Sequence, residues 1–351
     1  MNISQLITIA RERRCSDIHI TAARNIVFRI DGSLVETEIQ MSPAQQRELI
    51  LSMLNDKQRD LIDNGKDVDM CYTMENGQRQ RVNVFHQQKH LACVMRIIND
   101  KIPTFEELNL PETLRTLVEE PRGLILVTGP TGSGKSTSLA AMVDYINSNY
   151  ARHILTAEDP VEYVYTQKKS LIHQRDIGTD VASFEGALRS AMREDPDVIL
   201  IGEMRDYETI SAAVTAAETG HLVLSTLHTT GAASTIDRII DVFPPHNQQQ
   251  IRTQLASVLK GVVTQTLVPK ADGKGRVAAF EIMTGTDAVL NLIRENKCHQ
   301  LNSTIQTGSK AGMVLLDSYL AKLVRSGTIK MNDALEKVND RQAFLAEAGR
   351  V

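Results

Sequence analysis

Glycines, a lysine and adjacent hydroxyls lie close together in VTGPTGSGKSTSLAAM, residues 127–142. The spacing from Gly129 through Gly134 to Lys135 and Ser136 fits a phosphate-binding loop, in which backbone N–H groups and the start of a helix surround phosphate oxygens. An ordinary glycine-rich turn would not need a lysine followed by a hydroxyl. In such a loop the lysine reaches the outer phosphates and the next hydroxyl binds Mg²⁺. We therefore predict a nucleotide and Mg²⁺ site formed by Gly129, Pro130, Thr131, Gly132, Ser133, Gly134, Lys135, Ser136 and Thr137.

Two carboxylates and a histidine are candidates for phosphoryl transfer to water, which needs a group that positions or deprotonates the water. Glu203 follows the apolar run VILI and Gly202, and is our first candidate for the catalytic base. No aspartate ends that run, so Glu158, followed by Asp159, is the candidate that holds Mg²⁺ through water. His228 ends STLH and is a candidate sensor of the terminal phosphate. A solvated helix cap for each carboxylate and a structural role for the histidine stay open.

From residue 120 onward, apolar runs typical of strands alternate with stretches typical of helices. The strand-like runs are GLILVTG, HILTAED, PDVILIGE and HLVLSTLH, and the helix-like stretches follow Lys135, cover SFEGALRSAMRED and span 208–218. This alternation predicts an α/β domain with a parallel sheet and crossover helices, in which ligands bind at the carboxyl ends of the strands. The phosphate loop, Glu158, Glu203 and His228 would then gather at one edge of the sheet.

The first part of the chain has a different pattern, with strands such as NIVFRIDGSLV and a helix around SPAQQRELILSMLN. That pattern predicts a separate α+β domain. The segment NDKIPTFEELNLPETL contains Pro103 and Pro111, which is typical of a linker. We expect an N-terminal domain over residues 1–98, a linker over 99–112 and a second domain with C-terminal helices over 113–351.

Two arginines are expected to lie on the same side of a β-hairpin in RVNVFHQQKHLACVMR, residues 81–96. A turn at Gln88 and Lys89 would place Arg81 opposite Arg96, and cross-strand partners lie on the same face of a sheet. Two guanidinium groups side by side are unfavourable unless an anion lies between them, which makes this pair a candidate phosphate contact. A solvated basic face stays open, because the turn has no glycine and the pattern alone does not fix the register.

The composition of the 351-residue chain argues against several classes of function. A net charge of −4 gives no polybasic signal for nucleic acid, and 4% aromatic residues without tryptophan argue against stacking on bases. Cysteines 15, 71, 93 and 298 form no C-x-x-C pair, which argues against a zinc module. The sequence has no secretory signal and no apolar run of about 18 residues, so we expect a cytosolic protein without membrane insertion that could dock on a membrane protein.

Several ordered motifs together resemble the bacterial secretion ATPase superfamily, and most closely the PilT-like type IV pilus retraction ATPases. The motifs are GPTGSGKST, ILTAEDPVEYV, ALRSAMREDPDVILIGEMRD, TAAETGHLVLSTLHTTGAASTIDRIIDVFP and RVAAFEIMTGTDAVLNLIREN. The resemblance runs from CSDIHI at residue 15 to IQTGSKAGMVLLDSYL near residue 320. It implies a PAS-like N-terminal domain, a RecA-like P-loop NTPase domain and a homo-hexamer at the cytoplasmic face of the inner membrane.

The resemblance also implies an activity and roles for particular residues. Members of the family hydrolyse ATP, with Mg²⁺, to move an inner-membrane platform protein that handles pilin, and retraction of the pilus drives twitching motility. ATP closes one domain onto the other, and hydrolysis with product release reopens them. The matching positions are Lys135 and Ser136 in the Walker A box, Glu158 in the aspartate box, Glu203 in the Walker B box, His228 in the histidine box, and the N-terminal arginines Arg81 and Arg96.

One motif departs from the family and leaves alternatives open. Retraction ATPases typically carry A-I-R-N-L-I-R-E, whereas residues 288–295 read AVLNLIRE, so Leu290 replaces the first arginine. Leu290 and Arg294 would share a helix face that has lost one charge. A pilus-assembly or type II secretion ATPase of the same superfamily is therefore the close alternative, although no tetracysteine cluster supports it. A non-catalytic nucleotide-dependent scaffold is the alternative from another class, and a small-molecule kinase is a weaker one.

Overall fold

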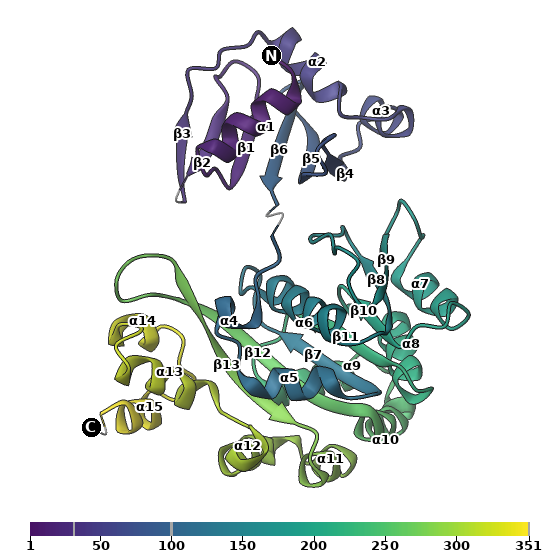
Figure 1. Cartoon of the computed structure of the whole chain (residues 1–351), viewed down its shortest axis with the longest axis vertical. Helices are drawn as coiled ribbons and strands as arrows, with labels where there is room; N and C mark the ends of the chain where they lie inside the picture. Colours follow the sequence, from purple (N-terminus) through teal and green to yellow (C-terminus); the bar gives the residue numbers. More distant parts are fainter. Residues whose placement is uncertain (31, 99–100, 350–351) are drawn as a thin grey trace. The chain divides into compact units, whose positions relative to one another are not determined.

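The computed structural model describes residues 1–30, 32–98 and 101–349, and it divides into two compact units (Figure 1). The first consists of Met1–Lys101 with Pro160–Val164, and the second of Ile102–Asp159 with Tyr165–Val351. Residues 99 and 100 of the expected linker lie outside the described residues, and a short helix, α4 (Phe105–Leu108), occupies part of the rest. Among the described residues, none of the helices combines the length and the apolar character that crossing a bilayer requires.

The first unit is an antiparallel sheet with helices, as the α+β pattern predicts. The strands follow the order β3-β2-β1-β6-β5-β4, and each neighbouring pair is antiparallel. The elements are α1 (Ile3–Glu12), β1 (Asp17–Ile20), β2 (Val27–Ile30), β3 (Ser33–Glu36), α2 (Pro43–Leu51), α3 (Asp56–Asp63), β4 (Val68–Thr73), β5 (Arg79–Gln87) and β6 (His90–Ile97).

The hairpin of β5 and β6 has the predicted register, with Arg81 opposite Arg96. Its two turn residues, Gln88 and Lys89, have φ angles of 48° and 65°. A two-residue hairpin turn in which both φ angles are positive matches the twist of the strands, and here it forms without glycine. The predicted hairpin is therefore confirmed, although its turn residues are not those that usually favour it.

One face of this sheet is the core of the first unit. Ile18, Val82 and Met95 are completely buried and pack in one cluster with Leu6 of α1 and Ile50 of α2. Successive side chains of a strand point to opposite faces. Residues next to these core positions, including the arginines of β5 and β6, therefore lie on the other face.

The second unit is built on the predicted parallel sheet, with strand order β13-β12-β7-β11-β10-β8-β9. Only β13, which pairs with β12, is antiparallel in this order. The strands are β7 (Gly123–Thr128), β8 (His153–Glu158), β9 (Leu171–Asp176), β10 (Val198–Ile201), β11 (Leu222–Leu227), β12 (Leu259–Pro269) and β13 (Arg276–Thr284). Every residue of β7, β10 and β11 is buried, as expected for parallel strands covered on both faces.

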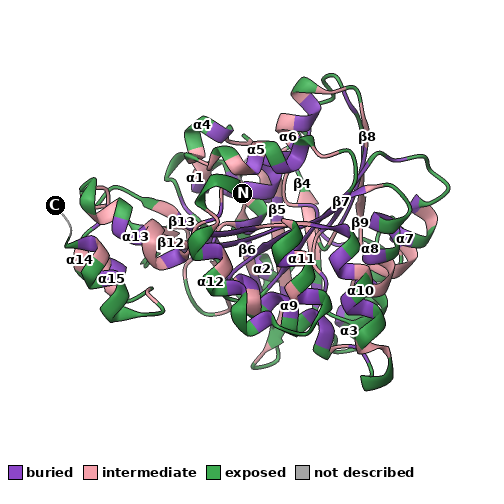
Figure 2. Ribbon diagram, turned by 90° about the horizontal axis from the view of Figure 1, so that it is seen from below, coloured by how far each residue is buried: buried purple, intermediate pink, exposed green. Residues whose placement is uncertain are grey.

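Helices cover both faces of this sheet (Figure 2). The helices α5 (Glu112–Glu119) and α6 (Lys135–Asn149) lie on one face. The other face carries α7 (Phe184–Ala191), α8 (Tyr207–Glu218), α9 (Ala232–Asp241), α10 (Gln248–Val258), α11 (Asp287–Arg294) and α12 (Leu301–Thr307). Short 3₁₀ turns span Pro245–Asn247, Cys298–Gln300 and Ser309–Ala311.

The chain ends in three helices, α13 (Leu316–Arg325), α14 (Met331–Leu335) and α15 (Arg341–Ala348). They form a second hydrophobic cluster around Phe344 and Leu320, both completely buried, against Val268 of β12 and Ala279 of β13. The long hairpin of β12 and β13 thus connects these helices to the parallel sheet.

Candidate functional site

The glycine-rich loop joins β7 to α6 and lies against β12. Gly129 has a φ angle of 139°, and a Cβ atom there would lie 2.2 Å from the carbonyl oxygen of Gln265. Only glycine fits, because the obstructing atom belongs to a backbone. Gly134, with a φ angle of 89°, is the N-cap of α6 and offers no side chain to cap the helix. The positive end of the α6 dipole therefore faces this loop, an arrangement suited to an anion.

Gln265 holds the loop in place from β12. Its side-chain nitrogen donates to the carbonyl oxygen of Ser133 at 2.8 Å, and its side-chain oxygen accepts from the hydroxyl of Ser138 at 2.8 Å. The residue is 2% exposed. Sequence reasoning missed it, although a glutamine in the apolar run VVTQTLV is an unusual choice for a buried strand.

Lys135 folds back onto its own loop. Its Nζ donates to the carbonyl oxygens of Gly129 at 2.8 Å and Pro130 at 3.2 Å, and the residue is 8% exposed. Beside it, the buried hydroxyl of Ser133 accepts or donates no hydrogen bond among the described residues. The Nζ atom thus donates to two neutral carbonyls beside a buried hydroxyl that makes no hydrogen bond within the part of the chain that the structure describes. A phosphate group fits here, because a hydrogen bond to an ionised acceptor is about twice as strong as a neutral one.

The four predicted strand ends are adjacent in the sheet. In the order β7-β11-β10-β8 the strands are parallel, so their carboxyl ends share one edge. That edge carries, in the same order, the phosphate loop, His228, Glu203 and Glu158. The structure therefore brings together the residues that the sequence singled out in this unit.

His228 connects the phosphate loop to Glu203. Its Nδ1 lies 3.4 Å from the hydroxyl of Thr131, and its Nε2 lies 3.2 Å from Oε1 of Glu203. These partners are consistent with a single tautomer, in which Nε2–H donates to the carboxylate and Nδ1 accepts from the hydroxyl. A movement of Thr131 would therefore alter the contact between His228 and Glu203.

Glu203 also contacts Arg205, which sequence reasoning did not single out. The Nε atom of Arg205 lies 2.5 Å from Oε1 of Glu203, and the carboxylate raises the pKa of the arginine. The side chain of Glu203 is 17% exposed, whereas that of Arg205 is 74% exposed. The backbone here is held to β11, because the hydroxyl of Thr226 donates to the carbonyl oxygen of Gly202 at 2.6 Å.

Glu158 is oriented by its own strand and by the neighbouring strand. Its Oε1 accepts from the hydroxyl of Thr156 at 2.7 Å and from the amide of Gln174 at 3.5 Å. A Cβ atom on Gly202 would lie 3.3 Å from the Cα atom of Glu158, so this glycine permits β8 and β10 to end side by side. The two candidate carboxylates thus lie at the carboxyl ends of neighbouring strands.

The residues fit a Mg²⁺ ion that is bound mainly by phosphate and water. Among the described residues, no group of three or more histidines, cysteines, aspartates or glutamates could hold a metal. Mg²⁺ at nucleotide sites usually keeps several waters and takes only one or two protein ligands. Ser136, which is exposed in the first turn of α6, carries a hydroxyl that would suit this place.

Arg96, one of the two predicted arginines, has a protein carboxylate beside it, which the sequence did not predict. Arg96 Nε donates to Oδ1 of Asp17 at 2.9 Å, and Arg29 Nε lies 3.9 Å from Oδ2 of the same carboxylate. Asp17 is opposite Arg96 on one side and opposite Arg29 on the other. Asp17 thus lies on the side of Arg96 away from Arg81, and the expectation of an anion between Arg81 and Arg96 stays a prediction.

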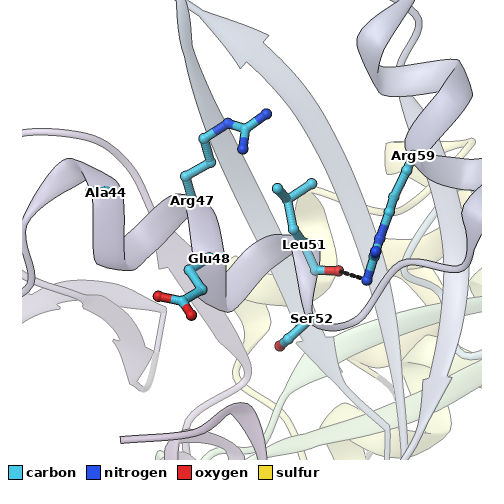
Figure 3. Close-up of a pocket in the computed structure, with 6 residues that line it drawn as sticks. All are labelled: Ala44, Arg47, Glu48, Leu51, Ser52 and Arg59. Carbon is cyan, nitrogen blue, oxygen red and sulfur yellow. Dashed lines mark hydrogen bonds between the residues drawn. The ribbon is translucent and has the colours of Figure 1, made fainter.

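A pocket of about 480 Å³ lies on the first unit (Figure 3). It is lined by Ala44, Arg47, Glu48, Leu51, Ser52 and Arg59, from α2, the turn after it and α3. Arg59 makes a hydrogen bond within the pocket lining, in which its Nη2 donates to the carbonyl oxygen of Leu51 at 3.1 Å. None of the predicted site residues lines this pocket.

Leu290, the departure from the family motif, is half-buried on α11 and packs against the hydrophobic core that the parallel sheet forms with α7–α12. Arg294 on the same helix is exposed, and its Nη1 donates to the side-chain oxygen of Asn291 at 3.4 Å. The leucine therefore contributes to the core, rather than to an exposed face as the helix spacing predicts.

Comparison with known proteins decides the family. The family model described as Type II/IV secretion system protein matches residues 1–349. The chain belongs to this family. Among members of the type II/IV secretion family, a Pseudomonas aeruginosa protein named type IV pilus retractation ATPase PilT is 47% identical over 98% of this chain and 100% of that protein. A twitching motility protein of Neisseria gonorrhoeae is 48% identical over 91% of this chain and 85% of that protein.

A solved structure of the type II/IV secretion family has the same fold. The crystal structure of the pilus retraction motor PilT with bound ADP superposes with a TM-score of 0.91 and 43% identity, over 98% of both chains. The resemblance to PilT-like ATPases is therefore confirmed. The predicted fold class, an α+β N-terminal part followed by an α/β P-loop part, is confirmed as well.

Proposed function

We propose that this chain is a motor ATPase that hydrolyses ATP to power type IV pilus retraction, in which pilin leaves the fibre and the cell moves by twitching. The observation that carries the proposal is the position of His228, which contacts Thr131 of the phosphate loop and Glu203. The similarity to the P. aeruginosa retraction ATPase, over 98% of this chain and 100% of that protein, supports the pilus as the object on which the motor acts.

ATP binds along residues 129–137 in this proposal. Lys135 exchanges the carbonyl oxygens of Gly129 and Pro130 for the more strongly accepting phosphate oxygens. Backbone N–H groups at the start of α6 add positive potential where the phosphates lie. Mg²⁺, held through the hydroxyl of Ser136 and through water on Glu158, offsets negative charge on the phosphates.

Glu203 is the proposed catalytic base, and Glu158 is the carboxylate that takes this role if Glu203 does not. Glu203 must first separate from Arg205, since the guanidinium contacts the same oxygen, Oε1, that would approach the attacking water. His228 senses the terminal phosphate through the loop, because its Nδ1 faces Thr131 and its Nε2 faces Glu203. General-base catalysis of this kind typically contributes about 10²- to 10⁴-fold in rate.

Arg81 and Arg96 are proposed to direct positive charge to the terminal phosphate. Their shared face of the β5–β6 hairpin supports this role. We propose residues 1–98 and 113–351 as two domains joined by residues 99–112. Hydrolysis and release of the phosphate remove the anionic partner of the arginines, and so shift the equilibrium between the closed and open arrangements of these domains. Arginines that contact a transferring phosphate can be worth about 10³- to 10⁵-fold in rate.

The proposed assembly is a homo-hexamer at the cytoplasmic face of the inner membrane. It acts on the inner-membrane platform protein of the pilus and reaches pilin only indirectly, without nucleic acid as a partner. One observation favours a second candidate function, pilus assembly or type II secretion, because Leu290 replaces the arginine of the retraction motif.

A deletion strain tests the direction of movement. Surface pili that accumulate without twitching would support retraction, whereas cells without pili would support assembly. Complementation with the Lys135→Ala variant is the matched control, since it removes the phosphate contact. Phosphate release in vitro tests the enzyme itself, and turnover no faster than that of Lys135→Ala would favour a nucleotide-dependent scaffold.

A further inference from the structure

A line of four charged residues crosses the first unit on the face of the sheet opposite its core. The register places Arg29 opposite Asp17, Asp17 opposite Arg96, and Arg96 opposite Arg81, on β2, β1, β6 and β5. Cross-strand partners lie close together on one face. Three positive side chains and one negative side chain therefore share a continuous line, with the carboxylate between two of the guanidinium groups.

The carboxylate of Asp17 is fixed from several sides. Its Oδ1 accepts from Arg96 Nε at 2.9 Å, and its Oδ2 accepts from the hydroxyl of Ser16 at 2.9 Å. Arg29 Nε lies 3.9 Å from Oδ2. The side chain of Asp17 is 9% exposed, whereas that of Arg96 is 70% exposed. The carboxylate thus holds Arg96 at its Nε atom, close to the sheet, while most of the arginine side chain remains exposed.

This contact leaves the outer end of Arg96 available. A guanidinium group has five N–H donors, and the bond to Asp17 uses the one on Nε. Within residues 1–30, 32–98 and 101–349, the structure records no hydrogen bond from the two terminal nitrogens of Arg96. A guanidinium held at Nε loses rotational freedom but keeps the pair of donors that binds a phosphate in a bidentate manner.

We propose that Asp17 is a positioning residue for Arg96, which orients the terminal nitrogens of that arginine for a phosphate oxygen. Asp17 itself does not touch the nucleotide. The inference rests on the proposed function, because it requires Arg96 to act on ATP. Asp17 also separates the charges of Arg29 and Arg96, which would otherwise repel each other on the same face.

The alternative is that Asp17 only stabilises the sheet. A structural ion pair would change the melting temperature and leave the turnover of the folded protein unchanged. A positioning role changes kcat for ATP hydrolysis, and does so only while Arg96 is present. The two roles are therefore separated by kinetics rather than by stability.

The test compares full-length wild type with Asp17→Asn, Arg96→Ala and the double variant, by kcat and KM for ATP and by thermal unfolding. Asp17→Asn keeps the shape but weakens the hold on Nε. We expect kcat to fall by about tenfold, since misplacement of a group by ~1 Å can cost on the order of 10²-fold in rate. Arg96→Ala should lower kcat further, and Asp17→Asn should then have no additional effect.

The controls separate this inference from the proposed function. Asp69→Asn changes an exposed carboxylate on the same sheet face, two residues from the partner of Arg81, and should leave kcat unchanged. A wild-type rate for Arg96→Ala would contradict the proposed role of Arg96, and the inference with it. Two outcomes would overturn only the positioning role. One is a lower kcat for Arg96→Ala with a wild-type kcat for Asp17→Asn. The other is an equal loss of kcat from Asp17→Asn in the wild-type and in the Arg96→Ala protein.

A second variant keeps the test decisive if Asp17→Asn does not fold. Arg96→Lys retains the positive charge but has no Nε–H donor for the carboxylate. This variant should hydrolyse ATP more slowly than wild type, and its melting temperature should stay within a few degrees of the wild-type value. A wild-type rate for Arg96→Lys would show that the hold of Asp17 on Nε is unnecessary.

Discussion

His228 Nε2 lies 3.2 Å from Oε1 of Glu203, so the residues that follow two neighbouring parallel strands are in direct contact. On its other side the histidine faces Thr131 of the phosphate loop, at 3.4 Å. The proposed base and the loop are therefore connected by one side chain, and a ligand on the loop can alter the carboxylate through it.

Replacement of the proposed base should separate binding from turnover. We expect Glu203→Gln to bind ATP as wild type does, because it changes no phosphate contact, and to lose at least about 10²-fold in kcat. Phosphate release and equilibrium binding of a fluorescent ATP analogue measure the two effects. Glu208→Gln, at an exposed position in the first turn of α8, is the control. Turnover that survives Glu203→Gln would transfer the role of the base to Glu158.

Replacement of Gln265 should destabilise the phosphate loop, because this side chain bonds Ser133 of the loop and Ser138 of α6. Gln265→Ala leaves the carbonyl oxygen of Ser133 and the hydroxyl of Ser138 without their partner, and a buried unpaired group costs about 1–3 kcal/mol. We expect a lower melting temperature together with weaker ATP binding, measured by calorimetry and titration. Gln254→Ala, which removes an exposed bond to Glu218, should change neither. Unchanged ATP affinity in Gln265→Ala would show that the loop holds its shape alone.

Local patterns predicted much of this molecule because they depend on residues that are close in sequence. The phosphate loop, the alternation of strands and helices and the β5–β6 hairpin each depend on a short segment, and the turn expected at Gln88 and Lys89 is the one observed. The partners Gln265, Arg205 and Asp17 could not be identified in the same way. Each makes its contact through tertiary structure or through a side chain that has no motif of its own, and the sequence pattern does not encode such pairs.

The surroundings of Leu290 were also beyond what a local sequence pattern can predict. The helix spacing correctly predicts that Leu290 and Arg294 lie on one helix, α11. It does not reveal that the leucine packs against the core of the parallel sheet while the arginine stays exposed, because a helix pattern does not say which neighbour covers each residue.

A buried carboxylate should make stability depend on pH. Glu281 on β13 is 4% exposed, and burial raises its pKa above 4.5, with Asp317 adding to the effect, although the N–H groups of Ala232 and Leu316 oppose it. A folded-state pKa above the unfolded value favours the protonated form. This contribution to stability is therefore complete below the unfolded pKa and is lost as pH rises through the folded pKa.

Glu281→Gln does not titrate, so its melting temperature relative to wild type should increase as pH rises from about 4.5 to 7. Thermal unfolding across this range measures the difference. Glu336→Gln, at an exposed position after α14, should show no such trend. A constant difference between Glu281→Gln and wild type would mean that the folded and unfolded states bind protons equally at this residue.

The cysteines should differ sharply in reactivity, because only a thiolate on the surface reacts quickly. Burial raises the pKa of Cys93 to about 12. The pKa of Cys298 is raised to about 11, mainly by burial. Cys15 is 5% exposed with a raised pKa, whereas Cys71 is half-buried. A short pulse of iodoacetamide on the native protein, read by mass spectrometry, should therefore modify Cys71 first, and the same pulse in urea should modify all four cysteines. Rapid native labelling of Cys93 would indicate that the core of the first unit opens on the time scale of the pulse.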